Sequence, residues 1–297
     1  MPLHRATRRL LAVVAGVAAL AASFTAGAVA GAGSADETGA APARSRLDEA
    51  AARIEAGALH PVERQALDAA AISGMLRAAG DPWGEWSQTP AGPAGAPAAV
   101  DVSTVPRPGG TATVLTVPSF DRGTGRAVRA ALAALPADGS GVVLDLRGNG
   151  GGLLDEAVET ASAFLASGVV VRCTRRDGSV QQFDVIGSGD TSTPLAVLVD
   201  GGSASAAEVV ASALAEPGRA VLVGSRTYGK GTVQEPQRLP DGSALELTVA
   251  TYTTPSGRSV EGVGLEPDLQ VAPASPPGVA LRRAVDVLTG LRADREG

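Results

Sequence analysis

Apolar residues between positions 111 and 225 follow two alternating patterns. Nearly continuous apolar runs such as GVVLDLR are typical of buried strands, whereas segments such as GTGRAVRAALAAL carry apolar residues at helical spacing. These patterns predict strands at 111–117, 141–147, 194–200 and 219–225, and helices at 123–135, 153–167 and 205–215. Strands that alternate with helices favour an α/β domain built in layers.

Two pairs of strands joined by turns add an antiparallel section to this domain. The segments 169–175 and 179–186 form a predicted hairpin that turns at Asp177-Gly178. The segments GTVQEPQRL and ALELTVATYTT form a second pair, which is joined at Asp241-Gly242. We therefore assign residues 111–275 to one layered core and residues 276–297 to a C-terminal helix.

The chain before position 111 has a different character. Residues 45–88 predict an N-terminal helical region, with apolar residues at helical spacing and a break near His60-Pro61. The sequence DPWGEW at 81–86 ends this region as a turn. Small, polar, Pro-rich or Gly-rich stretches predict linkers at 33–44 and at 89–110.

Residues 1–32 have the pattern of a targeting leader. A basic start is followed by an uncharged apolar run at 10–32. Ala28-Val29-Ala30 fits a cleavage site, but the run also reaches the roughly 20 residues that span a bilayer. A cleaved signal peptide and an uncleaved membrane anchor therefore both stay open. In either case the basic start predicts that the working domain lies outside the cytoplasm, secreted or anchored to the outer face of the membrane.

Composition excludes several classes of function. The chain has a net charge of -6, so it lacks the basic balance of a nucleic-acid-binding domain. A single cysteine, Cys173, excludes an internal disulfide. With only two histidines beside that cysteine, a zinc site of the usual ligand types is not expected. We predict no metal, no cofactor and no nucleic-acid partner.

Ser205 lies in GGSASAAE, at a predicted junction between a strand and a helix. Ser205 and Glu208 have the spacing of a capping box, which gives this serine a purely structural reading. The same position suits a nucleophile, because the N–H groups and the dipole of a helix N-terminus favour negative charge. The two histidines, His4 and His60, lie far away in the sequence, so a lysine is the next candidate base.

Lys230 lies in GSRTYGKGT, 25 residues after Ser205 (230 minus 205). This segment approaches the phosphate-binding pattern G-x-x-x-x-G-K-[ST], but position 231 is glycine, and strand periodicity follows where that pattern needs a helix. Nucleotide binding is therefore disfavoured. A solvated lysine in a glycine turn and a catalytic base are the readings that remain.

The segment VVLDLRGNGGG ends a predicted buried strand in a glycine-rich loop. It does not fit the dinucleotide-binding pattern, because Leu153 occupies the place of the third glycine. The glycines at 150–152 allow another chain to approach the backbone closely. This suits either helix–strand packing or the binding of a substrate chain and its developing oxyanion.

Taken together, these segments resemble the C-terminal processing peptidases, also called tail-specific proteases. The resemblance is carried by five strings in order, DLRGNGGGLLDEA, LVDGGSASAAEVVASAL, VGSRTYGKGTVQ, LPDGSALELTVATYTTPSGRS and GVGLEPD. It covers about residues 113–275, over half of the chain. It implies a serine/lysine peptidase core on a fold related to the crotonase ββα unit.

The resemblance also implies a role for each matching residue. Ser205 corresponds to the nucleophile, Lys230 to the general base, and Gln234 to the residue that orients the lysine. The N–H groups of Gly151 and Ala206 correspond to the oxyanion donors.

This chain departs from the family pattern at two places. Gly150 stands where family members often have proline or serine, which adds freedom to the loop. A PDZ module normally lies between the helical region and the core, but only about two dozen residues are available here for a module that needs roughly 80. The chain therefore resembles a member without PDZ, and selection of C-terminal tails cannot be carried over.

The chemistry that follows is acyl transfer to water by a Ser/Lys dyad. A free lysine has a pKa near 10.4, which must fall by about 3 units, at a cost of about 4 kcal/mol, for the amine to act near neutral pH. Desolvation of the amine is the available means of lowering this pKa.

We predict a serine peptidase acting on extracytoplasmic proteins or peptides, near C-termini or internally. A non-catalytic, membrane-anchored peptide-binding homologue stays open. So does an acyl-thioester or small-molecule enzyme on the same fold, which the secretory leader disfavours. The sequence leaves the substrate and the oligomeric state open.

Overall fold

The computed structural model describes residues 45–88, 100–108, 110–136, 141–276 and 278–296. The predicted leader, the predicted linker 33–44 and positions 89–99 of the second predicted linker lie outside these residues. The chain divides into two compact units, one ending at Arg64 and the other beginning at Gln65. The first contains α2 (Arg46–Gly57), which begins at Ser45. None of the helices within the described ranges combines the length and apolar character needed to cross a membrane.

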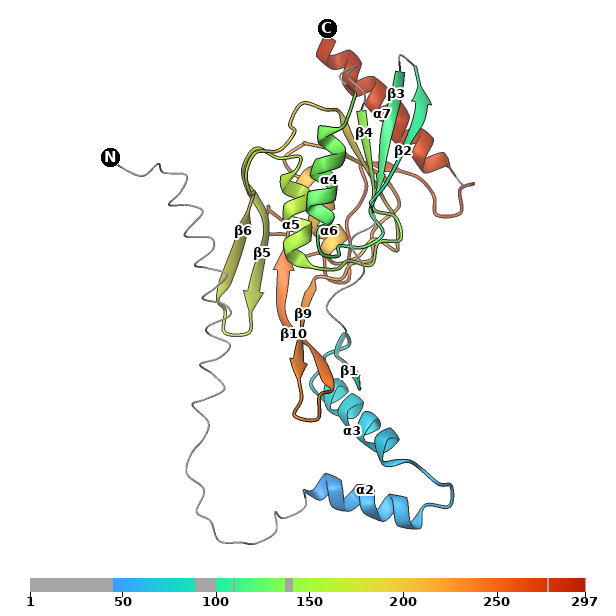
Figure 1. Cartoon of the computed structure of the whole chain (residues 1–297), viewed down its shortest axis with the longest axis vertical. Coiled ribbons are helices and arrows are strands. Elements are labelled where there is room, and N and C mark those ends of the chain that lie inside the picture. Colours follow the sequence, from blue (N-terminus) through green and yellow to red (C-terminus); the bar gives the residue numbers. More distant parts are fainter. Residues whose placement is uncertain (1–44, 89–99, 109, 137–140, 277, 297) are drawn as a thin grey trace, which may run out of the picture. The chain divides into compact units, whose positions relative to one another are not determined.

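The second unit is built around a six-stranded sheet in the order β11-β8-β7-β4-β3-β2. Figure 1 labels β4, β3 and β2 of this sheet. Its neighbours pair in parallel except for β2 and β3, which are antiparallel. Every residue of β4 and β7 is buried, in keeping with their continuous apolar runs. The strands are β2 (Asp101–Arg107), β3 (Gly110–Thr116), β4 (Gly141–Asp145), β7 (Leu195–Val199), β8 (Val221–Gly224) and β11 (Leu269–Gln270).

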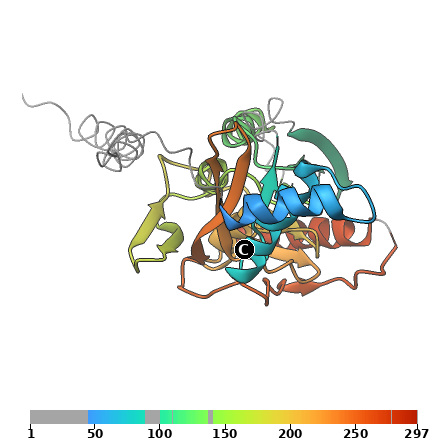
Figure 2. The same cartoon turned by 90° about the horizontal axis from the view of Figure 1, so that it is seen from below.

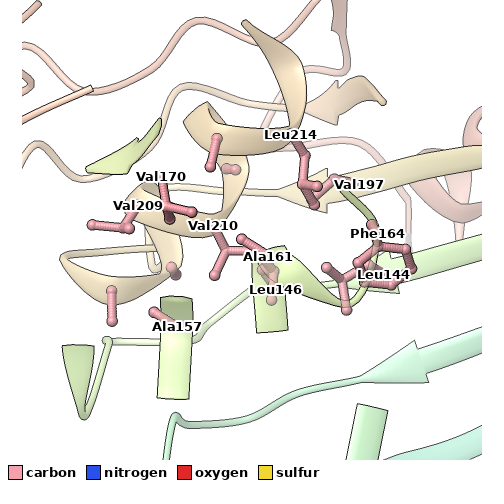
Figure 3. Packing of buried hydrophobic residues seen from close by; sticks show 14 of the residues in the cluster. Leu144, Leu146, Ala157, Ala161, Phe164, Val170, Val197, Val209, Val210 and Leu214 are labelled. Atoms are coloured by element: carbon pink, nitrogen blue, oxygen red, sulfur yellow. The ribbon is translucent and has the colours of Figure 1, made fainter. Parts of the chain in front are cut away.

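Helices cover both faces of this sheet, because alternate residues of each buried strand point to opposite sides. On one face, Leu144 and Val197 pack with residues of α5 and α6, such as Ala161 and Val210 (Figure 3). On the other face, Val143 and its neighbours pack against the C-terminal helix α7. The helices of this unit are α3 (Arg64–Ala78, all but its first residue), α4 (Thr124–Ala133), α5 (Leu154–Ser162), α6 (Ala206–Ala215) and α7 (Val279–Glu296).

A second, antiparallel sheet has the order β1-β10-β5-β6, with β9 also paired to β10. The β5–β6 hairpin stands at one edge of this unit (Figures 1 and 2). Many residues of β9 and β10 are only partly buried, so this sheet exposes one side to solvent. Its strands are β1 (Glu85–Ser87), β5 (Val169–Arg175), β6 (Val180–Asp184), β9 (Thr232–Arg238) and β10 (Ala244–Thr253).

The predicted α/β layered fold is confirmed, with two local corrections. Residues 101–107, which we assigned to a linker, form β2, and residues 85–87, at the end of a predicted turn, form β1. Both are edge strands, paired on one side only. An exposed edge strand needs no regular apolar alternation and tolerates proline, as at Pro106. The pattern that reveals buried strands is therefore missing at both places.

Candidate active site

The loops that carry the predicted site residues all follow parallel strands. The glycine-rich loop follows β4, the loop with Ser205 follows β7, and the loop with Lys230 follows β8. The carboxyl ends of neighbouring parallel strands lie at one edge of a sheet, which is where ligands bind in such folds. A cavity of about 260 Å³ lies there, and its lining includes Ser205, Lys230 and Gln234.

Ser205 has an unusual backbone conformation at the start of α6. Its φ of 54° makes it the one non-glycine residue with positive φ in the described part of the chain. A side chain in such a region costs on the order of 1–3 kcal/mol and persists only where the surroundings impose it. The Tyr252 hydroxyl donates to the Ser205 carbonyl at 3.1 Å, and the Ala204 N–H donates to the Asn149 carbonyl at 2.9 Å. These bonds hold the turn that presents the serine to the cavity.

Glu208 is fully buried in the first turn of α6 and joins two loops of the site. Its Oε2 accepts the N–H of Ser205 at 3.0 Å, as the capping pattern predicts, and also the N–H of Lys230 at 2.9 Å. Its Oε1 accepts the N–H of Gly229 at 2.9 Å and the hydroxyl of Thr227 at 2.5 Å. One carboxylate therefore fixes the backbone of both candidate catalytic residues. The sequence indicated its capping role, but no local pattern indicated its bonds to the lysine loop.

The two predicted oxyanion donors differ in their geometry. The N–H of Ala206 lies in the first helical turn, and no hydrogen bond engages it among the described residues. Gly151 lies beside the serine, since a Cβ built on it would be 3.0 Å from the Ser205 Cβ. However, the Gly151 N–H donates to Asn149 Oδ1 at 2.8 Å. This conformation therefore offers one open donor, and the other is engaged.

The Lys230 side chain ends over an aromatic ring. Its Nζ is 4.9 Å from the ring centroid of Trp83, and within the described ranges it forms no hydrogen bond or ion pair. Trp83 in turn contacts Tyr228 edge to face, with centroids 5.8 Å apart. The sequence interpretation treated Trp83 as part of a turn and missed this contact. Lys230 is also the only lysine in the chain.

Gln234 lines the same cavity but is held by two threonines. Its Nε2 donates to the hydroxyls of Thr232 at 2.9 Å and Thr248 at 3.1 Å. Its Oε1 makes no hydrogen bond among the described residues, so it is available to a lysine ammonium. The Thr248 hydroxyl and N–H both donate to the Asp81 carboxylate at 2.8 Å. Gln234 is therefore connected through Thr248 to the segment that carries Trp83.

Two ionisable groups beside the site have shifted pKa values. Burial acts to raise the pKa of Asp81, but hydrogen bonds from Thr248 and Trp83 outweigh it and hold that pKa below its ordinary value. Burial raises the pKa of Tyr252, and the charges of Glu208 and Glu261 raise it further. Tyr252 is therefore a neutral phenol that donates to Ser205.

Comparisons with known proteins identify the family of this chain. A model of peptidase family S41 matches residues 111–271, more than half of the chain. The carboxy-terminal-processing protease of Bartonella bacilliformis is 47% identical over 133 residues, which cover 44% of this chain and 31% of that protein. The carboxyl-terminal-processing protease of a Synechocystis species is 37% identical over 193 residues, which cover 62% of this chain and 45% of that protein.

A solved structure shares the fold as well. The photosystem II D1 C-terminal processing protease superposes with a TM-score of 0.55 at 34% identity, over 64% of this chain and 52% of its own. The chain spans less than half the length of the two curated relatives named above. The shared segment includes the glycine loop, the serine loop and the lysine loop. The predicted resemblance is confirmed: this chain belongs to peptidase family S41, with the C-terminal processing peptidases.

Proposed function

We propose that this protein is a serine endopeptidase in which Ser205 is the nucleophile and Lys230 the general base. The observation that carries the proposal is that Ser205, Lys230 and Gln234, from two different sheets and their loops, line one cavity on the fold of a peptidase family. The strained backbone of Ser205 supports it, since such strain concentrates at functional sites.

The proposed reaction is acyl transfer to water. Neutral Lys230 takes the proton from the Ser205 hydroxyl, and the serine oxygen attacks the carbonyl carbon of the scissile peptide bond. The Ala206 N–H holds the resulting oxyanion, joined by the Gly151 N–H once it turns away from Asn149. The Lys230 ammonium, oriented by Gln234 Oε1, protonates the leaving amine, and water then hydrolyses the acyl-enzyme.

The substrate class and the location are part of the same proposal. Relatives are named for carboxyl-terminal processing, and we extend to this chain the cleavage of extracytoplasmic proteins, near their C-termini. The predicted leader supports the location, as a signal peptide or a membrane anchor. The 13 residues between β1 and β2 (88–100) are too few for a PDZ module, so tail capture must use another surface or be absent.

The test is cleavage of an unstructured protein substrate by variants of the full chain. Ser205→Ala and Lys230→Ala should each lower kcat/KM by at least about 1,000-fold, because each removes one member of a dyad that acts as a unit. Lys230→Arg keeps the charge but cannot lose its proton, so it should be equally inactive. Ser188→Ala, at an exposed serine, is the matched control and should retain full activity. Cleavage retained by the Ser205 or Lys230 variants, with unchanged thermal unfolding, contradicts the dyad.

Two observations favour a second candidate, a non-catalytic peptide-binding homologue. The Gly151 N–H is engaged by Asn149, and the lysine amine contacts Trp83 and makes no hydrogen bond to Ser205 within the described ranges. A binding protein would keep these contacts permanently, whereas a peptidase must exchange them during turnover. A serine-reactive fluorophosphonate separates the two, because an active nucleophile becomes labelled at Ser205. A protein that binds unstructured peptides and is never labelled supports the second candidate.

A further inference from the structure

A lysine base becomes an ammonium ion each time it accepts the serine proton, and that charge must be stabilised within the site. In a histidine-based serine peptidase a buried carboxylate holds the protonated base. Here the nearby carboxylate of Glu208 is occupied by backbone N–H groups and the Thr227 hydroxyl. In the described part of the chain no carboxylate pairs with the Lys230 side chain. Besides Gln234 Oε1, which is neutral, the partner that the structure offers this ammonium is an aromatic face.

The geometry of the Trp83 ring fits this task. An ammonium within about 6 Å of an indole centroid is attracted by the ring quadrupole, and tryptophan gives the strongest such contact of the aromatic residues. The Lys230 Nζ lies at 4.9 Å. The edge-to-face contact with Tyr228 supports the ring from the side, on the loop that also carries Lys230.

Asp81 and the start of the second sheet hold Trp83 in place. The Trp83 N–H donates to Asp81 Oδ1 at 3.1 Å, and the same carboxylate accepts two bonds from Thr248 on β10. Beyond the ring, β1 pairs with β10, and Trp86 Nε1 donates to the Ser243 hydroxyl at 3.1 Å. The segment is therefore fixed to β10 on both sides of Trp83.

The placement of Trp83 is not explained by its own hydrogen bonding. Its indole Nε1 is buried and has no acceptor within the described ranges. A buried donor without a partner costs free energy, so most buried indoles find an acceptor. The ring instead contacts Lys230 and Tyr228.

We propose that Trp83 is a positioning residue of the active site, whose ring face holds the Lys230 ammonium formed during turnover, and that Asp81 fixes the segment that carries it. This inference rests on the proposed function for its catalytic meaning. The contact itself can be tested without any activity.

The other charged and titratable groups around Lys230 stay unchanged in every Trp83 variant. They are Asp81 in the segment before β1, Glu208 on α6, Tyr228 in the lysine loop, Tyr252 on β10 and Glu261 after β10, which accepts the Gly231 N–H at 2.5 Å. A difference between Trp83 variants therefore reports the loss of the indole face.

The first arm measures the Lys230 amine directly. Because the chain has one lysine, a full-length protein labelled with ¹³Cε-lysine gives a single side-chain signal whose pH titration yields the pKa of Lys230. Removing the ring removes a partner of the charged form. Trp83→Leu and Trp83→Met should therefore lower the pKa of Lys230 by roughly 0.4–1.5 units. Trp83→Phe, which keeps a weaker aromatic face, should lower it by less.

Trp86→Leu is the matched control for this arm. It changes the other tryptophan of the same segment, which bonds to Ser243 and not to Lys230, so the lysine titration should stay unchanged. A rise in the pKa of Lys230 in Trp83→Leu and Trp83→Met would show that the ring acts as a desolvating wall, and would overturn the proposal. An unchanged value, or an equal shift with phenylalanine, would overturn it too. Both Trp83→Leu and Trp83→Met are made, because one of them is enough to test the proposal if the other does not fold.

The second arm measures cleavage as a function of pH. In Trp83→Leu, the acid limb of the kcat/KM profile should move to lower pH, and the plateau above that limb should fall by about 2- to 30-fold. In Trp83→Phe, both the shift of the limb and the fall of the plateau should be smaller. A lower plateau with an unmoved limb indicates a merely structural role and contradicts the inference. If the wild-type chain cleaves nothing, the proposed function fails, and the first arm still decides whether Trp83 holds the ammonium.

Discussion

The two halves of the candidate site are built in different ways. Ser205 is the N-cap of α6, in which residues 206–214 are all buried, and the side chains of Tyr252 and Glu208 hold its strained backbone by its main-chain carbonyl and N–H. Lys230 precedes β9 and Gln234 lies in it, in a sheet where many residues of β9 and β10 are half exposed. The side chains of both residues contact other side chains, those of Trp83, Thr232 and Thr248. The Asp81–Thr248 bond of this second half joins residues 167 positions apart.

Because of this difference, we expect substitutions in the two halves to affect stability and activity in different proportions. A change in the serine half disturbs backbone that packs against the buried helix α6, so stability and activity should fall together. A change in the lysine half removes side-chain contacts on a partly solvated sheet, so activity should fall more than stability. Glu208 belongs to both halves, because its carboxylate binds N–H groups of both loops.

The largest effect is expected for Glu208→Ala. This change leaves the N–H groups of Ser205, Gly229 and Lys230 without their shared acceptor in a buried place, which should cost about 3–5 kcal/mol of unfolding free energy. Cleavage should be lost as well. Urea unfolding and a cleavage assay measure both, and Glu208→Gln, which retains an acceptor oxygen, should lose less. An alanine variant as stable as the wild type would show that the carboxylate does not join the halves.

Gly152→Ala should have the next largest effect. A Cβ on Gly152 would lie 2.5 Å from the Phe120 carbonyl oxygen, and its φ of 139° disfavours a side chain. We expect a loss of about 2–4 kcal/mol and a matching loss of activity. Gly150→Ala is the matched control, because no atom lies within 4 Å of its built Cβ. If the two variants had equal thermal stability, the claim that the serine half has a rigid backbone would be contradicted.

Thr248→Val tests the lysine half. It removes the hydroxyl between Gln234 and Asp81 while it keeps the volume and the β-branched shape. Stability should fall by about 1 kcal/mol, whereas kcat/KM should fall by about 3- to 10-fold as Gln234 loses its orientation. If Thr248→Val lost as much stability as Gly152→Ala and kept its full activity, the difference between the serine half and the lysine half would be contradicted.

The smallest effect is expected on the pH dependence of stability, to which Asp81 contributes. Its pKa is lowered in the folded state, so its stabilising contribution is present above the unfolded value near 3.9 and is lost as pH falls through the folded pKa. Asp81→Asn should therefore be less stable than the wild type at neutral pH, and the difference should shrink below about pH 4. Denaturant unfolding at several pH values measures this, and a difference that grows in acid would contradict it.

The serine half could be predicted well from the sequence because its signals are local. The apolar runs of β4 and β7 and the spacing of Ser205 and Glu208 each reflect a single element. The engaged N–H of Gly151 could not be predicted, because it depends on a side-chain bond to Asn149 within one loop conformation.

The lysine half could be predicted only in part. Ordered motifs predict Lys230 and Gln234, but the sequence around Trp83 predicts only a turn. Its contact with Lys230 joins positions far apart in the sequence, and no periodicity reports such a contact. The edge strand β1, which fixes this segment, is three residues long and carries no strand pattern of its own.

The most direct test of the account is fluorophosphonate labelling of the full chain, with the modified residue identified by mass spectrometry. We predict that the wild type is labelled at Ser205, and that Lys230→Met, with unchanged thermal unfolding, loses this labelling almost completely. The two halves would then meet at one dyad, in which the lysine activates the serine. Labelling of Ser205 at the wild-type rate in Lys230→Met would contradict the account.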